Sequence, residues 1–263
     1  MKAALVPILC ERLRPVTRRE GDRMETEAQI GNRRTGKERE LVFLLDVDNT
    51  LLDNDALKAE IANRVEALVG PEPARRFWVL YEEVRQEQDF VDYPETIRRF
   101  VHEYGEVAKP QRLQGIFDTL PFSSFLYPGV LETLECLRSL GTVVILSDGD
   151  QVFQPLKIRK SGLEEAVGGN VLIYVHKEHE LPRVFDRYPA DHYVVVDDKS
   201  RILSALEEYN PSTFITVFVL QGHYAQEGAT EPAPDFVIHH ISELQSFTKE
   251  RFLQGKEQSS SAR

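Results

Sequence analysis

LVFLLDVDNT, residues 41–50, places five apolar residues directly before two carboxylates, Asp46 and Asp48. An apolar run of this length is typical of a strand that is buried on both faces of a parallel sheet. Strands that alternate with helices predict an α/β fold with a doubly wound, Rossmann-like parallel sheet as its core. The comparable runs that support this prediction are rich in β-branched residues and separated by amphipathic segments; they cover 142–147, 171–175, 192–197 and 214–220.

The interval between Asp53 and Pro128 has helical periodicity and no convincing strand, so we predict an inserted α-helical subdomain there. Three of its four candidate helices begin with a proline, which the first helical turn tolerates. The candidate helices cover 56–69, 73–88, 94–104 and 110–119. The predicted organisation is a disordered leader (1–40), an α/β core (41–53 and 122–250), the inserted subdomain (54–121) and a flexible tail (251–263).

The composition is acidic and argues against several classes of partner. The chain holds 32 Lys and Arg against 43 Asp and Glu, a net charge of -11, which disfavours nucleic acid binding. Because no apolar run approaches the ~20 residues of a membrane-spanning helix, we expect no membrane partner. Two cysteines without disulfide or zinc spacing fit a reducing, cytoplasmic location. An acidic protein that acts on an anionic substrate needs local compensation, such as a bound divalent cation.

Reactive side chains follow four of the predicted strands at their carboxyl ends. Ligands of open α/β sheets bind beyond these ends, so we expect segments that are far apart in the sequence to meet at one edge of the sheet. The segments are Asp46-Val47-Asp48-Asn49-Thr50, Ser147-Asp148-Gly149-Asp150, His176-Lys177 and Asp197-Asp198-Lys199.

This set resembles the haloacid dehalogenase superfamily. In that family a DxDxT motif follows the first strand, a Ser or Thr ends the second, a Lys comes next and an acidic pair follows the fourth strand. The resemblance covers about 41–220, and the inserted helices match the family's cap between the first and second motifs. Lys157 and Lys160 are alternatives for the third motif, but Lys177 fits better because it directly follows a strand, 20 residues before Asp197.

The resemblance implies Mg²⁺-dependent cleavage of a small phosphate monoester, in the family's manner. Asp46 would attack phosphorus to form an aspartyl-phosphate, and Asp48 would serve as general acid and then general base. Mg²⁺ would relieve the repulsion between close carboxylates and a phosphate dianion. Its implied ligands are Asp46, Asp198 and the backbone carbonyl of Asp48, with Asp197 beside them. The implied phosphate-binding residues are Thr50, Ser147, Asp148, Gly149 and Lys177. Of these, Lys177 would also stabilise the transition state.

Several features have a second interpretation. Asp150 could simply cap a helix, and His176 and His179 are interpreted as solvated loop residues rather than metal ligands. The pairs Arg75-Arg76 and Arg98-Arg99, with Phe77, Trp78 and Tyr81, could contact a small phosphorylated metabolite. The favoured interpretation is that they are solvated arginines and helix-packing aromatics. A phosphomutase, a haloacid dehalogenase and a non-catalytic phosphate-binding protein remain the alternative functions.

Overall fold

A computed structural model describes residues 40–261 except 89, 227 and 230. For residues 257–261 it describes the backbone alone. The predicted disordered leader lies outside the described residues, apart from Glu40. Within the described part, six parallel strands form one sheet in the order β3-β2-β1-β4-β5-β6. The strands are β1 (Leu41–Leu45), β2 (Thr142–Asp148), β3 (Val171–Tyr174), β4 (His192–Asp197), β5 (Phe214–Val219) and β6 (Phe236–Ile238). The predicted parallel α/β core is confirmed.

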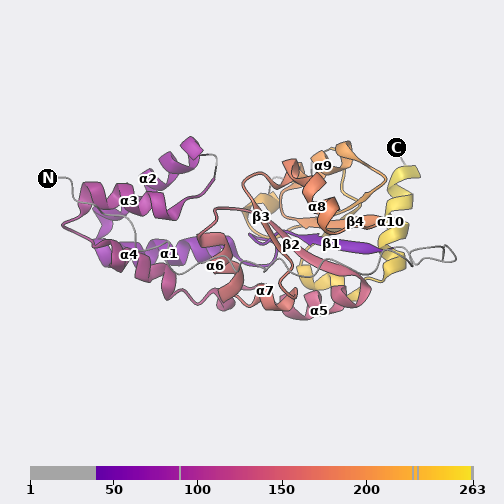
Figure 1. Cartoon of the computed structure of the whole chain (residues 1–263), viewed down its shortest axis with the longest axis horizontal. Helices are drawn as coiled ribbons and strands as arrows, with labels where there is room; N and C mark the ends of the chain where they lie inside the picture. The colour runs from indigo at the N-terminus through magenta and orange to yellow at the C-terminus, as the bar shows by residue number, and fades with distance from the viewer. Residues whose placement is uncertain (1–39, 89, 227, 230, 262–263) are drawn as a thin grey trace, which may run out of the picture. The chain divides into compact units, whose positions relative to one another are not determined.

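Both faces of the sheet are buried, as the continuous apolar runs predict. Successive side chains of a strand point to opposite faces. Phe43 and Leu45 accordingly belong to one apolar cluster, whereas Val42 and Leu44 belong to the other. Figure 1 shows α8 and α9 over one face and α5 and α7 over the other. The helices that cover the sheet are α5 (Val130–Leu140), α6 (Phe153–Lys160), α7 (Leu163–Ala166), α8 (Leu181–Arg187), α9 (Ser200–Tyr209) and α10 (Lys249–Ser261).

Four helices lie between β1 and α5 in the sequence: α1 (Asn54–Val69), α2 (Pro71–Gln88), α3 (Tyr93–Tyr104) and α4 (Pro110–Asp118). We call residues 54–121 the helical insertion. The first helix begins two residues before its predicted start because the Asp53 side chain accepts the N–H of Ala56 and caps the helix. In the part of the chain that the structure describes, no helix is long and apolar enough to cross a membrane.

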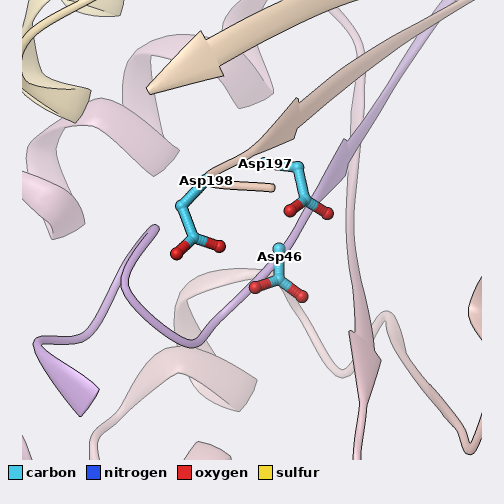
Figure 2. Close-up of side chains that lie close together, drawn as sticks. All are labelled: Asp46, Asp197 and Asp198. Atoms are coloured by element: carbon cyan, nitrogen blue, oxygen red, sulfur yellow. The ribbon is translucent and has the colours of Figure 1, made fainter. Parts of the chain in front are cut away.

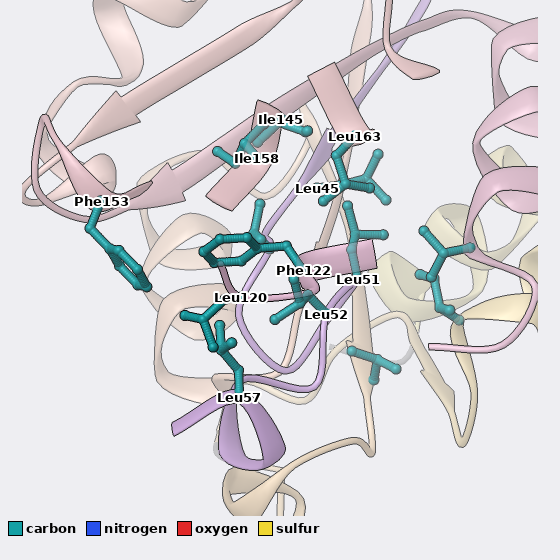
Figure 3. Packing of buried hydrophobic residues seen from close by; sticks show 14 of the residues in the cluster. Leu45, Leu51, Leu52, Leu57, Leu120, Phe122, Ile145, Phe153, Ile158 and Leu163 are labelled. Carbon is teal, nitrogen blue, oxygen red and sulfur yellow. The ribbon is translucent and has the colours of Figure 1, made fainter. Parts of the chain in front are cut away.

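Two chain segments join the helical insertion to the sheet, and they run side by side. Leu52 pairs with Leu126 in an antiparallel bridge, and the N–H of Asp53 donates to the carbonyl of Phe125 at 2.8 Å. Apolar side chains pack around this junction, among them Leu52, Leu57, Phe122 and Phe153 (Figure 3). The junction therefore belongs to the apolar cluster on one face of the sheet, and this packing holds the start of α1 close to the end of β1.

The C-terminal region corrects one prediction. Residues 251–263 were expected to form a flexible tail, but Lys249–Ser261 is helix α10 and Phe252 is fully buried. The Phe252 ring packs against Phe43 and Phe247, with centroids 5.3 and 5.2 Å apart. Phe252 anchors a mostly polar segment, together with the partly buried Leu253 and the ion-paired Lys256. A composition-based interpretation misses such anchors. The short elements β6 and α7 were not predicted either.

The sheet order places a topological switch point between β1 and β4. From β1 the chain builds outward to β2 and β3 on one side, and to β4, β5 and β6 on the other. In open α/β sheets ligands bind at such a point, beyond the carboxyl ends of the strands. Asp46 directly follows β1, and Asp197 ends β4. The fold itself therefore brings the first and last predicted motifs together.

Candidate active site

Three buried carboxylates meet at the switch point. One oxygen from each of Asp46, Asp197 and Asp198 lies within 4.8 Å of the others. Figure 2 shows the three side chains converging from the ends of β1 and β4. Each side chain is at most 2% exposed. Close buried carboxylates repel one another, so this arrangement requires cations to be stable.

Lys177 supplies one of these cations. Its ammonium lies 2.5 Å from Oδ1 of Asp46 and 2.6 Å from Oδ2 of Asp197. Burial alone would raise the pKa of the Asp46 carboxyl, but the ammonium groups of Lys177 and Lys199 outweigh burial and lower it. The alternatives for the third motif lie elsewhere, because Lys157 contacts Asp48 and Lys160 donates to the carbonyl of Asp118. Of the three lysines, Lys177 is the one placed against Asp46.

Asp197 and Asp198 differ in how far their oxygens are satisfied. Asp197 receives the Lys177 ammonium on Oδ2 and the N–H of Lys199 on Oδ1, at 2.8 Å. Both oxygens of Asp198, and Oδ2 of Asp46, are buried and find no hydrogen-bond donor in the described part of the chain. Burial and repulsion from Asp46 and Asp197 raise the pKa of Asp198 to about 9.

The unsatisfied oxygens fit a hard cation. Mg²⁺ prefers carboxylate oxygens and carbonyl oxygens as protein ligands, and it keeps several waters. Asp46 and Asp198 together offer three buried oxygens that lack a donor within the described residues. The donor set of this cluster could therefore bind a divalent metal ion. Asp197, engaged by Lys177 and by a backbone N–H, is suited to hold the lysine rather than the ion.

The loop after β1 is folded around Asn49. This residue has a left-handed backbone (φ 59°), which asparagine tolerates better than most residues. Its Oδ1 accepts the N–H groups of Asn54 and Asp55 at the start of α1. Asp55 in turn contacts the His223 ring at 2.8 Å, from the loop after β5. Asn49 thereby links the predicted DxDxT loop to the helical insertion, a role that the sequence analysis did not anticipate.

Thr50 belongs to the same loop but is fully buried. Its hydroxyl has no hydrogen-bond partner among the residues that the structure describes. The structure therefore gives the Thr50 side chain no exposed surface through which it could contact a substrate.

Ser147 and its neighbours at the end of β2 already form hydrogen bonds within the protein. Ser147 is 1% exposed, and its hydroxyl accepts a hydrogen bond from Nε2 of Gln154 at 2.8 Å. The N–H of Gly149 donates to the carbonyl of Tyr174, and the role of Gly149 in phosphate binding stays a prediction. A Cβ at Gly149 would lie 2.8 Å from the Gln154 side chain, at a φ of +156°. Gln154 is a site residue that no sequence pattern indicated.

The two aspartates of this loop have separate roles. Asp148 accepts the backbone N–H of Lys177 at 2.9 Å, and burial raises the pKa of its carboxyl. Asp150 accepts the N–H groups of Val152 and Phe153 at the start of α6. The capping interpretation of Asp150 is therefore confirmed.

A cavity of about 760 Å³ lies between the carboxyl ends of the strands and the helical insertion. Among the predicted site residues, Asp48, Asp148, Gly149 and Asp198 line it. Asp46 does not contribute to this lining. The other lining residues include cations and aromatic rings from both parts of the chain: Lys58, Tyr81, Arg85, Tyr93, Phe153, Lys157, His176, His179, Lys199, Arg201, His223 and Tyr224.

All four arginines considered in the sequence analysis pair with carboxylates outside the cavity. Arg76 pairs with Glu83 and Glu103, and Arg99 pairs with Glu87 and Glu95. Arg75 and Arg98 are paired on the surface as well. None of the four lines the cavity, whereas Tyr81 does. The interpretation as solvated arginines holds for these positions.

Comparison with known proteins places this site in a family. The model of the haloacid dehalogenase-like hydrolases matches residues 41–219, which contain every predicted motif. The chain belongs to the haloacid dehalogenase-like hydrolases. Its sequence matches none of the curated proteins.

Solved structures agree with this family. A protein of Burkholderia xenovorans LB400 described as a haloacid dehalogenase-like hydrolase is 40% identical, with a TM-score of 0.75. The match covers 82% of this chain and 99% of that one.

Two more distant structures share the fold. A HAD-hydrolase of Bacillus subtilis bound to magnesium is 17% identical (TM-score 0.52; 79% of this chain, 97% of that one). An L-2-haloacid dehalogenase of Xanthobacter autotrophicus, with chloropropionic acid covalently bound, is 15% identical (TM-score 0.52; 78% of this chain, 96% of that one).

Proposed function

We propose that the protein is a Mg²⁺-dependent phosphohydrolase that cleaves a small phosphate monoester through an aspartyl-phosphate on Asp46. The observation that carries this proposal is the set of buried carboxylate oxygens of Asp46 and Asp198 that lack a donor within the described residues. Displacement of a halide from carbon does not require a cation site, whereas transfer of a phosphoryl dianion between carboxylates does. The acidic charge of the chain also calls for a cation at a site that binds an anionic substrate.

Asp46, Asp198 and the backbone carbonyl of Asp48 would hold the ion. Bound there, Mg²⁺ would neutralise the carboxylates and offset the charge of the phosphoryl oxygens. Lys177 keeps Oδ1 of Asp46 in a fixed position and adds a second positive charge at the nucleophile. Asp197 orients Lys177 from the other side.

The reaction then divides into two transfers. A carboxylate oxygen of Asp46 forms a bond to phosphorus while the bond to the leaving oxygen breaks, and Asp48 protonates that oxygen. Asp48, now a carboxylate, removes a proton from water as the water attacks the aspartyl-phosphate, and free Asp46 and inorganic phosphate result. Because Asp46 is 2% exposed, side chains that cover it must rearrange when substrate enters.

The helical insertion acts as the cap of this site in our proposal. It forms the cavity wall opposite the strand ends, with Lys58, Tyr81, Arg85 and Tyr93. A cavity of this size suits a small phosphorylated metabolite rather than a protein substrate. Closure over such a substrate would exclude bulk water from the reacting phosphorus.

The test is phosphate release from a broad panel of phosphate monoesters, in Mg²⁺ or in EDTA. We expect Mg²⁺-dependent release that is lost in Asp46→Asn and retained in Asp186→Asn, a matched change at an exposed position on α8. Failure to release phosphate from any ester would overturn the proposal. Halide release from a 2-haloacid without Mg²⁺ would favour a dehalogenase, and isomerisation of a sugar phosphate without phosphate release would favour a mutase.

A further inference from the structure

Lys157 of helix α6 lies where the α/β core meets the helical insertion. Its side chain is 2% exposed, although it lines the cavity. The ammonium contacts Oδ1 of Asp48 and lies 3.2 Å from Oδ1 of Asn54, the first residue of α1. It also lies 5.5 Å from the centroid of the Phe153 ring. A carboxylate, an amide oxygen and an aromatic ring therefore surround this one charge.

A buried ammonium is costly unless it is paired, and removal of one partner from such a pair destabilises the other. Lys157 satisfies this condition through Asp48. The pair also fixes Asp48, because Lys157 is carried by a helix whose first turn is capped by Asp150. The Asp48 side chain, by contrast, is 27% exposed and lines the cavity. One oxygen is thus held, and the other remains available to a ligand.

We propose that Lys157 is the positioning residue for Asp48, the general acid of the proposed function on which this inference rests. With Oδ1 held by Lys157, Oδ2 takes up a proton from water in the cavity before the first transfer and then carries it toward the leaving oxygen. In the first transfer Asp46 bonds to phosphorus, the bond to the leaving oxygen breaks, and the Asp48 proton moves to that oxygen. Lys157 keeps its own proton throughout and forms no bond to the substrate.

This role differs from a purely structural one in its dependence on the leaving group. Phenolate is a strong base and leaves more easily when a proton is delivered to it. The para-nitrophenolate ion is a much weaker base and leaves without help. Misplacement of Asp48 therefore slows phenyl phosphate more than para-nitrophenyl phosphate, although the two esters have nearly the same size. A general loss of structure slows both equally.

The experiment compares kcat/KM for these two esters in Mg²⁺, because this ratio contains only the steps up to release of the alcohol. Lys157→Met keeps the length of the side chain and removes its charge. Lys157→Arg keeps the charge and serves as the rescue variant. Lys160→Met removes an exposed lysine of the same helix, whose ammonium binds the carbonyl of Asp118, and is the matched control.

For Lys157→Met we expect kcat/KM to fall about 10- to 100-fold with phenyl phosphate and less than about threefold with para-nitrophenyl phosphate. Lys157→Arg should recover part of the loss with phenyl phosphate, and Lys160→Met should change neither ester. If the wild type hydrolyses these esters and Lys157→Met loses activity equally with both, the role of Lys157 is overturned and the proposed function stands. A wild-type protein that hydrolyses no phosphate monoester would overturn the proposed function, and this role with it.

Discussion

The ammonium of Lys177 lies 2.5 Å from Oδ1 of Asp46, although 131 residues separate the two in the sequence. The same ammonium lies 2.6 Å from Asp197, so one cation joins the ends of β1 and β4. Burial opposes the charge on Lys177, but Asp197 and Asp46 raise its pKa well above the ordinary value. The two carboxylates therefore favour the charged form of the lysine, and both depend on that charge.

Replacement of Lys177 by methionine should damage stability and turnover together. The change leaves Asp46 and Asp197 buried without their cation, which costs about 3–5 kcal/mol in the free energy of unfolding. Turnover of a phosphate ester should fall at least ~100-fold, because the charge beside the nucleophile is lost. Urea unfolding and phosphate release measure the two effects.

The double variant Asp46→Asn with Lys177→Met provides the control for stability. It removes one of the stranded carboxylates along with the lysine, so its loss of stability should be smaller than that of Lys177→Met alone. An equal or larger loss in the double variant would show that the ion pair does not set the cost.

Asp198 should report metal binding through thermal stability. Its buried carboxyl faces Asp46 and Asp197 without a donor among the described residues, so a divalent cation stabilises the folded state that binds it. We expect Mg²⁺ to raise the melting temperature of the wild type and to leave that of Asp198→Asn unchanged. In EDTA, Asp198→Asn should be at least as stable as the wild type, because a neutral amide removes the repulsion among the carboxylates.

Differential scanning fluorimetry with and without Mg²⁺ measures this difference. Asp186→Asn, an exposed change on α8, should respond to Mg²⁺ as the wild type does. A full Mg²⁺ response in Asp198→Asn would remove Asp198 from the ligand set.

Glu95 on helix α3 should contribute a stabilising effect that depends on pH. Hydrogen bonds from Arg98 and Arg99 lower the pKa of the Glu95 carboxyl to about 2, even though partial burial opposes this shift. A carboxyl with a lowered pKa in the folded state stabilises the protein above its unfolded pKa, and the effect disappears as the pH falls toward about 2. Since Arg98 is largely exposed, solvent limits the contribution to about 1 kcal/mol.

Urea unfolding at neutral pH and in acid tests this contribution. Glu95→Gln should be less stable than the wild type at neutral pH and equally stable in strong acid. Glu66→Gln, at an exposed position on α1, should track the wild type at both. A difference between Glu95→Gln and the wild type that stays constant with pH would contradict the linkage.

Sequence alone predicted those parts of the site that the strand ends dictate. Asp46, Lys177 and Asp197 each stand at or beside the carboxyl end of a strand, so a parallel sheet must bring them together. Their apolar runs were long enough to identify the strands. The helical insertion was likewise predictable, because prolines and helical periodicity mark its helices.

The partners that sequence could not predict come from helix faces and loops. Gln154 binds Ser147 and Lys157 binds Asp48 because one side of α6 faces the strand ends. Which side of a helix faces a site is set by its packing in the folded protein and cannot be derived from spacing in the sequence. His223 contacts Asp55 across 168 residues through a loop after β5. No spacing rule connects such residues. Lys199 is a different case, since it belongs to the predicted segment Asp197-Asp198-Lys199 but was given no role there.

The buried ring of Phe252 should make α10 part of the stable core. Phe252 is fully buried against Phe43 and Phe247, in a helix whose other residues are mostly polar. Phe252→Ala removes this packing and leaves a cavity, so the free energy of unfolding should fall by about 3–5 kcal/mol. Gln254→Ala, an exposed change on the same helix, should cost less than ~0.5 kcal/mol. Urea unfolding measures both, and a loss below ~1 kcal/mol for Phe252→Ala would show that α10 does not belong to the cooperative core.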